Sequence, residues 1–106
     1  MTPLAGSNRG YTDGPASLAQ FDTTKGVSAD EGGNIFVADH DNGRIRRIDW
    51  VTRVVSTVAG NAINYQDGVG TAAGFIDPIG LTMNNGSIYV VDSSSVRHIG
   101  MMHVSI

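Results

Sequence analysis

The sequence predicts an all-β fold built from two copies of one four-stranded antiparallel unit. Three observations carry this prediction. Glycine occurs 14 times among 106 residues, about twice its usual share of roughly 7%, which indicates many tight turns. Short runs rich in β-branched and aromatic residues stand between those turns, as is typical of strands. The same order of motifs occurs twice along the chain, which indicates a duplicated unit.

The duplication becomes visible when Tyr11 is placed on Tyr65, 54 residues further along the chain. The other residues that coincide in this frame are Asp13 and Asp67, Gly14 and Gly68, Phe21 and Phe75, and Gly26 and Gly80. After short loop deletions, "NIFVAD" falls on "SIYVVD" and "RIRRI" falls on "SVRHI". We therefore interpret residues 1–106 as a single two-repeat unit. Repeat one covers about 6–59, repeat two covers about 60–106, and residues 1–5 resume the pattern of the outermost strand.

The strands of the first copy follow in order. The first lies near Gly26–Asp30 and ends at "DEGGN", a tight turn in which glycine tolerates positive φ. The second is Ile35–Asp39, which is rich in apolar residues that favour strands. The segment "HDNG" turns the chain into a third strand at about Arg44–Asp49. The fourth, "VVSTVA", covers about Val54–Ala59.

The second copy gives four matching strands at Leu81–Met83, Ile88–Asp92, Val96–Gly100 and His103–Ile106. Asn85-Gly86 is a strong hairpin signal, because a type I′ turn needs positive φ at both central residues. No segment competes convincingly as a helix, and "SLAQF" is long enough for one short turn.

A four-stranded antiparallel unit that repeats through a long return loop is typical of a β-propeller blade. The first strand would line the central channel, and the fourth would lie outermost. The stretch 59–79 then crosses from the outer edge of one blade to the inner edge of the next. Its Tyr-x-Asp-Gly motif belongs to that crossing.

The segment "GVSADEGGNIFVADHDNGRIRRID" resembles an NHL repeat. Blades of that family read roughly Gly-Val-Ala-Val-Asp, then Gly-Asn-Ile-Tyr-Val-Ala-Asp, then Asn-x-Arg-Ile. The second copy keeps "IYVVD" but lacks equivalents of Asn42 and Arg44. The resemblance implies a propeller, often six-bladed, and no single activity. NHL domains mostly bind proteins and some bind RNA, and related six-bladed propellers include lyases and hydrolases.

Two blades cannot surround a channel, because closed propellers usually have four to eight. Each blade carries apolar residues on both faces, with Ile35 and Val37 on one and Phe36 and Ala38 on the other. Head-to-tail stacking would cover the two outer faces and close a ring. The ends of the chain also match in register, as "VSI" stops where "MTPLAG" would resume. We expect a homotrimer that forms a closed six-bladed propeller. The alternatives are a tetramer with eight blades and a natural or engineered fragment of a longer propeller.

Charge and composition argue against several partners. The formal net charge is −3, and the basic cluster of Arg44, Arg46 and Arg47 is offset by neighbouring aspartates, so we expect no nucleic-acid partner. No apolar run approaches the roughly 20 residues of a membrane span, so we expect no membrane partner. The chain has no cysteine, which excludes disulfides and thiolate chemistry.

Catalytic chemistry has little support in the sequence. No Gly-x-Ser-x-Gly elbow or Walker loop is present, and the three histidines lack the spacing of a metal site. We expect no catalytic residue, no metal and no cofactor. A propeller hydrolase or lyase with a channel metal, to which Asp30 would contribute, is the alternative.

Two aspartates end the second strand of each copy. The carboxylates of Asp39 and Asp92 can accept hydrogen bonds from the amides of the following turn. In the first copy, Asp39 can also meet Arg44, which follows Asn42 in the repeat pattern. Metal ligation by these aspartates is the alternative.

The Tyr-x-Asp-Gly motif has two interpretations. In the structural one, Asp13 and Asp67 bond to amides of their own loops, and Gly14 and Gly68 supply positive φ. Phe21 and Phe75 then plug the space between blades. In the functional one, the side chains of Tyr11, Asp13, Tyr65 and Asp67 form aromatic and acidic pockets on one rim, suited to a carbohydrate or a cationic ligand.

Trp50 lies at the tip between the third and fourth strands of the first copy. An exposed tryptophan can stack on a sugar or anchor a protein partner, and packing on its own turn is the alternative. The leading function is therefore a non-catalytic module that assembles with itself and presents loops to a protein or a glycan. A structural or engineered propeller fragment without a ligand is the second candidate.

Overall fold

The computed structural model describes residues 3–60, 68–69, 74–84, 87–93, 95–100 and 103–105. It contains two five-stranded antiparallel sheets, of order β1-β5-β4-β3-β2 and β6-β10-β9-β8-β7. The first sheet, hereafter the first blade, consists of β1 (Gly14–Pro15), β2 (Thr24–Ala29), β3 (Asn34–Asp39), β4 (Arg44–Asp49) and β5 (Val54–Ala59). The second sheet, the second blade, consists of β6 (Gly68–Val69), β7 (Pro78–Asn84), β8 (Ser87–Asp92), β9 (Ser95–Gly100) and β10 (His103–Ser105).

The four long strands expected in each copy are present. The prediction of four strands in each blade missed one, because each sheet has a fifth strand of two residues, β1 or β6. Gly14 pairs with Val55 in the first blade, and Gly68 pairs with Val104 in the second. Both short strands begin at the glycine of Tyr-x-Asp-Gly. Each Tyr-x-Asp-Gly segment therefore adds an outer edge strand to the sheet that it precedes in sequence.

The turn expected at "HDNG" lies within the described residues, whereas the one expected at Asn85-Gly86 does not. A 3-10 helix, η1 (His40–Asn42), joins β3 to β4, and Gly43 ends it with φ of +63°, a conformation that favours glycine. In the second blade, Asn84 pairs with Ser87, and the hairpin turn expected at Asn85-Gly86 lies outside the described residues. No helix among the described residues is long and apolar enough to cross a membrane.

Each blade has two apolar faces, as the alternation along β3 predicted. We call "front" the face that carries Ile35, Val37 and Ile48 in the first blade, and Ile88, Val90 and Ile99 in the second. We call "back" the face that carries Phe36, Ala38 and Ile45 in the first blade, and Tyr89, Val91 and Val96 in the second. The front residues Val37 and Ile48 belong to one apolar cluster, whereas the back residues Phe36 and Ala38 belong to another.

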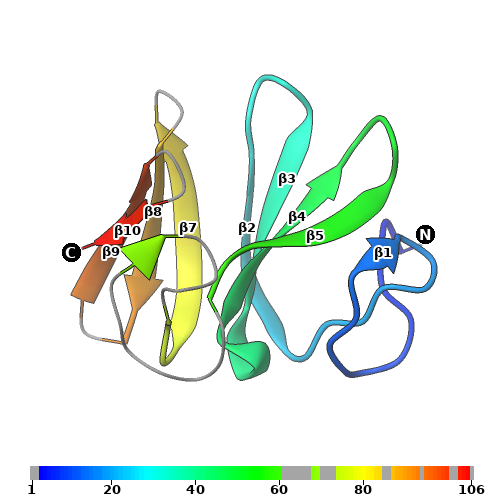
Figure 1. Ribbon diagram of the computed structural model, residues 1–106, viewed down its shortest axis with the longest axis horizontal. Helices are drawn as coiled ribbons and strands as arrows, with labels where there is room; N and C mark the ends of the chain where they lie inside the picture. Colours follow the sequence, from blue (N-terminus) through cyan, green and yellow to red (C-terminus); the bar gives the residue numbers. More distant parts are fainter. Residues whose placement is uncertain are drawn as a thin grey trace.

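The back of the first blade packs against the front of the second, and we call this contact the joint. Its buried residues are Phe36, Ala38, Ile45, Val58, Ala59, Phe75, Ile88, Val90 and Ile99. In Figure 1, the inner strands β2 and β7 lie side by side in the middle of the molecule, and β1 and β10 lie toward opposite ends. The core of the protein is therefore shared between the two blades.

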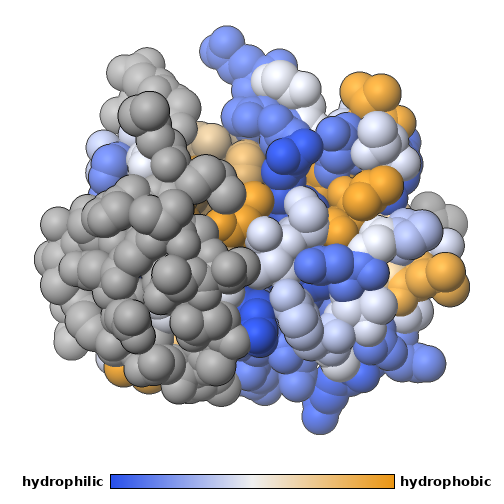
Figure 2. Space-filling model, in the orientation of Figure 1, coloured by the Kyte–Doolittle hydropathy of each residue, from blue (hydrophilic) through white to orange (hydrophobic). Residues whose placement is uncertain are grey.

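The two remaining faces are open. On the front of the first blade, segment 5–21 covers part of the sheet and leaves a hollow of about 450 Å³, which Phe21, Val27 and Val37 help to line. On the back of the second blade, Leu81, Tyr89 and Val91 help to line a hollow of about 260 Å³. Figure 2 shows hydrophobic residues exposed between hydrophilic ones on the side of the molecule that the first blade forms.

Candidate functional site

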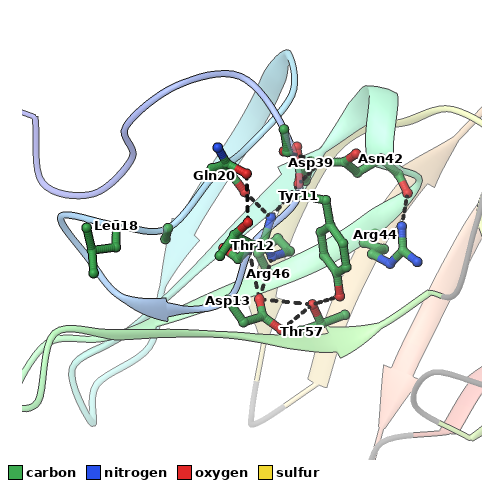
Figure 3. Close-up of polar contacts among 12 residues, drawn as sticks. Tyr11, Thr12, Asp13, Leu18, Gln20, Asp39, Asn42, Arg44, Arg46 and Thr57 are labelled. Carbon is green, nitrogen blue, oxygen red and sulfur yellow. Dashed lines mark hydrogen bonds and ion pairs between the residues drawn. The ribbon is translucent and has the colours of Figure 1, made fainter.

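A buried arginine, Arg46, organises residues 5–25, the segment that is equivalent to the crossing at 59–79 (Figure 3). Its side chain is fully buried, and Nη1 donates to Asp39 Oδ2 at 2.7 Å while Nη2 donates to Asp13 Oδ1 at 2.8 Å. The same guanidinium donates to the backbone carbonyls of Thr12 and Gln20, at 2.9 and 2.8 Å. Arg46 therefore fixes this segment to β3 and β4 with charge-assisted hydrogen bonds, which are the strong kind.

The second blade repeats this arrangement at Arg97. Its fully buried side chain donates to Asp92 Oδ2 at 2.7 Å and to the carbonyl of Gly74 at 3.1 Å. Gly74 stands 54 residues after Gln20, so both bonds have their counterpart in the first blade. A buried ion pair that loses one partner leaves an uncompensated charge, which destabilises by about 3–5 kcal/mol. The two Arg–Asp pairs are therefore structural elements of each blade.

The sequence suggested that Asp39 and Asp92 accept hydrogen bonds from the turns that follow them, but the described residues show both bonding to amides that lie before the first long strand of their blade. Asp39 makes no side-chain cap to η1, and it accepts from the amide of Asp22 at 2.7 Å instead. Asp92 likewise accepts from the amides of Ile76 and Asp77, at 3.0 and 2.7 Å. Both carboxylates thus hold the crossing segment that comes before their blade, because the arginine and the amides converge on it.

Asn42 and Arg44 also differ from the expected arrangement. Arg46, and not Arg44, is the arginine that the structure pairs with Asp39. Arg44 donates to the carbonyl of Asn42 at 3.0 Å. Asn42 Nδ2 donates to Asp39 Oδ2 at 2.8 Å and to the carbonyl of Gly10 at 2.9 Å. Arg46 and Arg97 occupy the same position in the two repeats. That coincidence is the sequence signal that could have revealed the buried Arg–Asp pairs.

The first Tyr-x-Asp-Gly motif lies beside Arg46. The Tyr11 hydroxyl is 2.6 Å from Thr57 Oγ1, and the guanidinium groups of Arg44 and Arg46 lie 4.0 and 4.7 Å from the ring centroid. In the view of Figure 3, the ring lies between these two side chains. Favourable cation–π contacts of this kind occur within about 6 Å. Tyr11 as a residue is nevertheless 41% exposed, so these contacts leave part of it open to solvent.

Asp13 bonds to side chains of the sheet rather than to amides of its own loop. Its carboxylate accepts from Thr57 on β5 at 3.0 Å as well as from Arg46 on β4. Gly14 follows with φ of +126°, as the structural interpretation of the motif required. In the second motif, Tyr65 and Asp67 lie outside the described residues, and Gly68 begins β6.

The two phenylalanines occupy equivalent places on the fronts of their blades. Phe75 is fully buried in the joint, and the Arg97 guanidinium lies 5.1 Å from its ring. Phe21 packs on the front cluster of the first blade, with Arg46 4.7 Å from its ring. Phe75 therefore plugs the space between two blades, whereas Phe21 borders the open hollow.

Trp50 lies apart from the tyrosine motif. It follows the last residue of β4, whereas Arg44, which contacts Tyr11, begins that strand. Trp50 as a residue is 49% exposed, and the Arg53 guanidinium lies 4.1 Å from the centroid of its ring. One face of the ring is thus occupied by an arginine of its own turn. Trp50 and Tyr11 belong to opposite rims of the blade and do not form one site.

Polar groups also meet across the joint on the rim that carries η1. His40 Nδ1 lies 2.6 Å from Asp41 Oδ1, and its Nε2 contacts Asp77, which precedes β7. A hydrogen bond from the Thr23 hydroxyl, followed by one from His40, lowers the pKa of Asp41. The described residues contain no group of three or more side chains that could hold a metal ion.

The other groups with possible chemistry are engaged in local contacts. Asp30, the residue considered for a channel metal, accepts from the amide and the side chain of Asn34, at 2.9 and 3.0 Å, and these bonds lower its pKa. His98 Nε2 lies 3.0 Å from Ser87 Oγ, but no carboxylate among the described residues pairs with this histidine. Nothing in the described part of the chain completes a nucleophile, base and orienting group.

No family model matches the sequence, but individual proteins do. The chain is 42% identical to NHL repeat-containing protein 2 of Gallus gallus over 76 residues, which are 72% of this chain and 10% of that protein. The Homo sapiens protein of the same name matches with the same identity and coverage. The chain belongs to the NHL-repeat family. It is also 30% identical over 96 residues to the Arabidopsis thaliana protein SUPPRESSOR OF QUENCHING 1, chloroplastic, of which it covers 9%.

This NHL-repeat chain spans about a tenth of the length of the curated relatives that it matches. Two solved structures from Bacteroides thetaiotaomicron have the same propeller-like fold over a quarter of their length. One, a structural genomics protein of unknown function, matches 95% of this chain with a TM-score of 0.81 and 26% identity, and 26% of that chain is covered. The other, an auxiliary nutrient binding protein, matches 84% of this chain with a TM-score of 0.73 and 19% identity, and 25% of it is covered.

Proposed function

We propose that this NHL-repeat chain is a non-catalytic propeller module that assembles head to tail with copies of itself. The observation that carries the proposal concerns the front faces. Ile88, Val90 and Ile99 form the front of the second blade and are buried in the joint. Their equivalents on the first blade form an apolar front that borders an open hollow. The chain thus offers a second surface of the kind that the joint already covers.

The back faces support the same arrangement. Phe36, Ala38 and Ile45 are 8%, 0% and 0% exposed in the joint. Their equivalents Tyr89, Val91 and Val96 are 38%, 43% and 57% exposed on the open back of the second blade. Removing apolar surface from water stabilises by about 25 cal/mol per Å². A second copy whose front covers this back would therefore gain the same kind of contact as the joint.

Head-to-tail contacts make a closed ring when the rotation between neighbouring units closes. Propellers usually close with four to eight blades, and each chain contributes two. Three copies supply the six blades that the NHL resemblance implies. We therefore favour a homotrimer that forms a six-bladed propeller.

The ring would act as a binding module through its rim, where the crossing loops of all copies recur. Tyr11 and Asp13 are partly exposed there, and Trp50 is exposed on the opposite rim. A protein or a glycan is the proposed partner, and repetition of each loop around the ring would raise the avidity of weak contacts. The similarity in fold to an auxiliary nutrient binding protein is consistent with a binding role.

Light scattering coupled to size exclusion tests the assembly. The wild-type chain of 11.1 kDa should elute with the mass of three copies. Val91→Asp places a charge on the open back and should yield folded single chains. The matched control is Val51→Asp, at a tip residue that is 83% exposed, and it should leave the trimer intact. A wild-type chain that stays folded and monomeric at micromolar concentration would contradict the proposal.

A further inference from the structure

The inner strands of the two blades touch backbone to backbone at Gly26. A Cβ built on Gly26 would lie 2.6 Å from the carbonyl oxygen of Ile79 and 2.8 Å from Cα of Gly80. Real side chains do not tolerate such distances, so position 26 must lack a side chain for β2 and β7 to pack as they do. Gly26 has no positive φ in the left-handed region, so close approach is the reason for glycine here.

Gly80 occupies the equivalent place in the second blade, 54 residues further on. A Cβ built on Gly80 would meet no described atom within 4 Å, and its φ also lies outside the left-handed region. Neither the backbone conformation nor a neighbour in the described part of the chain requires glycine at this position. A glycine in the interior of a strand weakens the strand. No contact within the described part of the chain explains why Gly80 is a glycine.

We propose that Gly80 is the position on which the inner strand of a second copy docks. This inference rests on the proposed self-assembly and specifies its contact. In the joint, Ile79, Gly80 and Leu81 contact Gly26. By the repeat, residues 25–27 of the second copy take those three places against Gly80.

The surroundings of both strands fit this contact. Leu81 packs against the apolar cluster of the joint, whereas its equivalent Val27 is 64% exposed. Gly26 and Val27 line the hollow on the front of the first blade. Gly80 and Leu81 line the hollow on the back of the second. If the front of one copy packs on the back of another, Val27 becomes buried in the way that the joint buries Leu81.

The contact also determines the register between copies. Two backbones can approach this closely only where a glycine faces the neighbouring strand. Side chains alternate between the two faces of a strand, so the next back-facing residue of β7 is Thr82, which pairs with the back residue Tyr89. A shift of the incoming strand to that position would oppose a side chain, and not a glycine, to it. Gly80 is therefore the residue that specifies how a second copy aligns, and all joints around the ring would use the same glycine contact.

The test is a dilution series by sedimentation velocity on wild type, Gly80→Ala, Gly80→Val and Gly32→Val. Overpacking a close contact should raise the concentration at which Gly80→Val dissociates roughly 10- to 100-fold, and Gly80→Ala by less. Gly32 is exposed, has no left-handed φ, and meets only ordinary contacts. Gly32→Val should therefore dissociate like wild type. Thermal unfolding of each variant monitors the fold, and Val at a strand position should not weaken it.

The outcomes separate this inference from the assembly itself. If wild type assembles and both Gly80 variants dissociate at the wild-type concentration, self-assembly stands and the role of Gly80 is wrong. If wild type does not assemble at any concentration, both proposals fail together. If Gly80→Val unfolds, Gly80→Ala decides, because a single methyl group that leaves both fold and assembly unchanged would overturn the inference.

Discussion

The joint and the two open faces are built from equivalent residues and differ mainly in what covers them. Phe36 is 8% exposed in the joint, and Tyr89, its equivalent on the open back, is 38% exposed. Val91 and Val96 stand where the first blade has Ala38 and Ile45, and both positions stay apolar although they are 43% and 57% exposed. Large exposed apolar surfaces usually mark interaction sites. The repeat therefore places apolar residues on both faces of each blade, including the two faces that no blade of this chain covers.

Loss of a buried Arg–Asp ion pair should destabilise either blade strongly. Arg46→Ala leaves the fully buried Asp39 without its partner and should lower the free energy of unfolding by about 3–5 kcal/mol. Arg97→Ala should cost a similar amount, because the second blade repeats the pair. Urea denaturation in the monomeric Val91→Asp background measures both. Arg47→Ala is the control, because its ion pair with Asp49 is partly exposed and should contribute below about 1 kcal/mol. Equal losses for all three variants would contradict the account.

The covered front of the second blade and the open front of the first should respond differently to the loss of a phenylalanine. Phe75→Ala empties a fully buried place in the joint and should cost about 3–5 kcal/mol. Phe21→Ala, at the edge of the open hollow, should cost at least about 1 kcal/mol less in the monomeric background, since solvent already reaches this side chain. Thermal and urea unfolding of both variants provide the measurement. A larger loss for Phe21→Ala than for Phe75→Ala would show that the two fronts are not related as described.

The smallest expected effect concerns acid and the turns at the ends of the strands. Hydrogen bonds from the side chain and then the amide of Asn34 hold the pKa of Asp30 below its ordinary value. Its carboxylate therefore stabilises the fold above about pH 4, and the contribution is lost as pH falls through the lowered pKa. Asp30→Asn should make the loss of stability between pH 7 and pH 3 smaller than in wild type. Glu31→Gln, an exposed neighbour, is the control, and an identical pH dependence of wild type and Asp30→Asn would exclude this contribution.

Much of the fold could be predicted from the sequence, because strands and turns are encoded locally. The alternation along β3 assigned Ile35 and Val37 to one face and Phe36 and Ala38 to the other, and the structure confirms both. The two-residue strand at Gly14–Pro15 could not be predicted, because so short a strand has no alternation and depends on pairing with distant β5. The fifth strand of each blade is therefore a product of the folded arrangement.

The candidate site was harder to predict than the strands. Arg44 and Arg46 stand two residues apart on one strand, so spacing alone does not say which of them meets Asp39. The pairing of β4 with β5 has an irregularity between Ile45 and Arg46, and no sequence pattern predicts that irregularity. The partners of Asp13 on β4 and β5 are likewise fixed by long-range contacts. The repeat alignment remains the one sequence signal that singles out Arg46 together with Arg97.

We propose that the open front of one copy packs on the open back of another in the way that the two blades of one chain already pack. Native mass spectrometry of the wild-type chain tests it most directly, because it counts the copies in each particle. The account predicts particles of three copies, with six blades in all. If wild type gives only single folded chains, as Val91→Asp is expected to, the proposed head-to-tail packing is wrong.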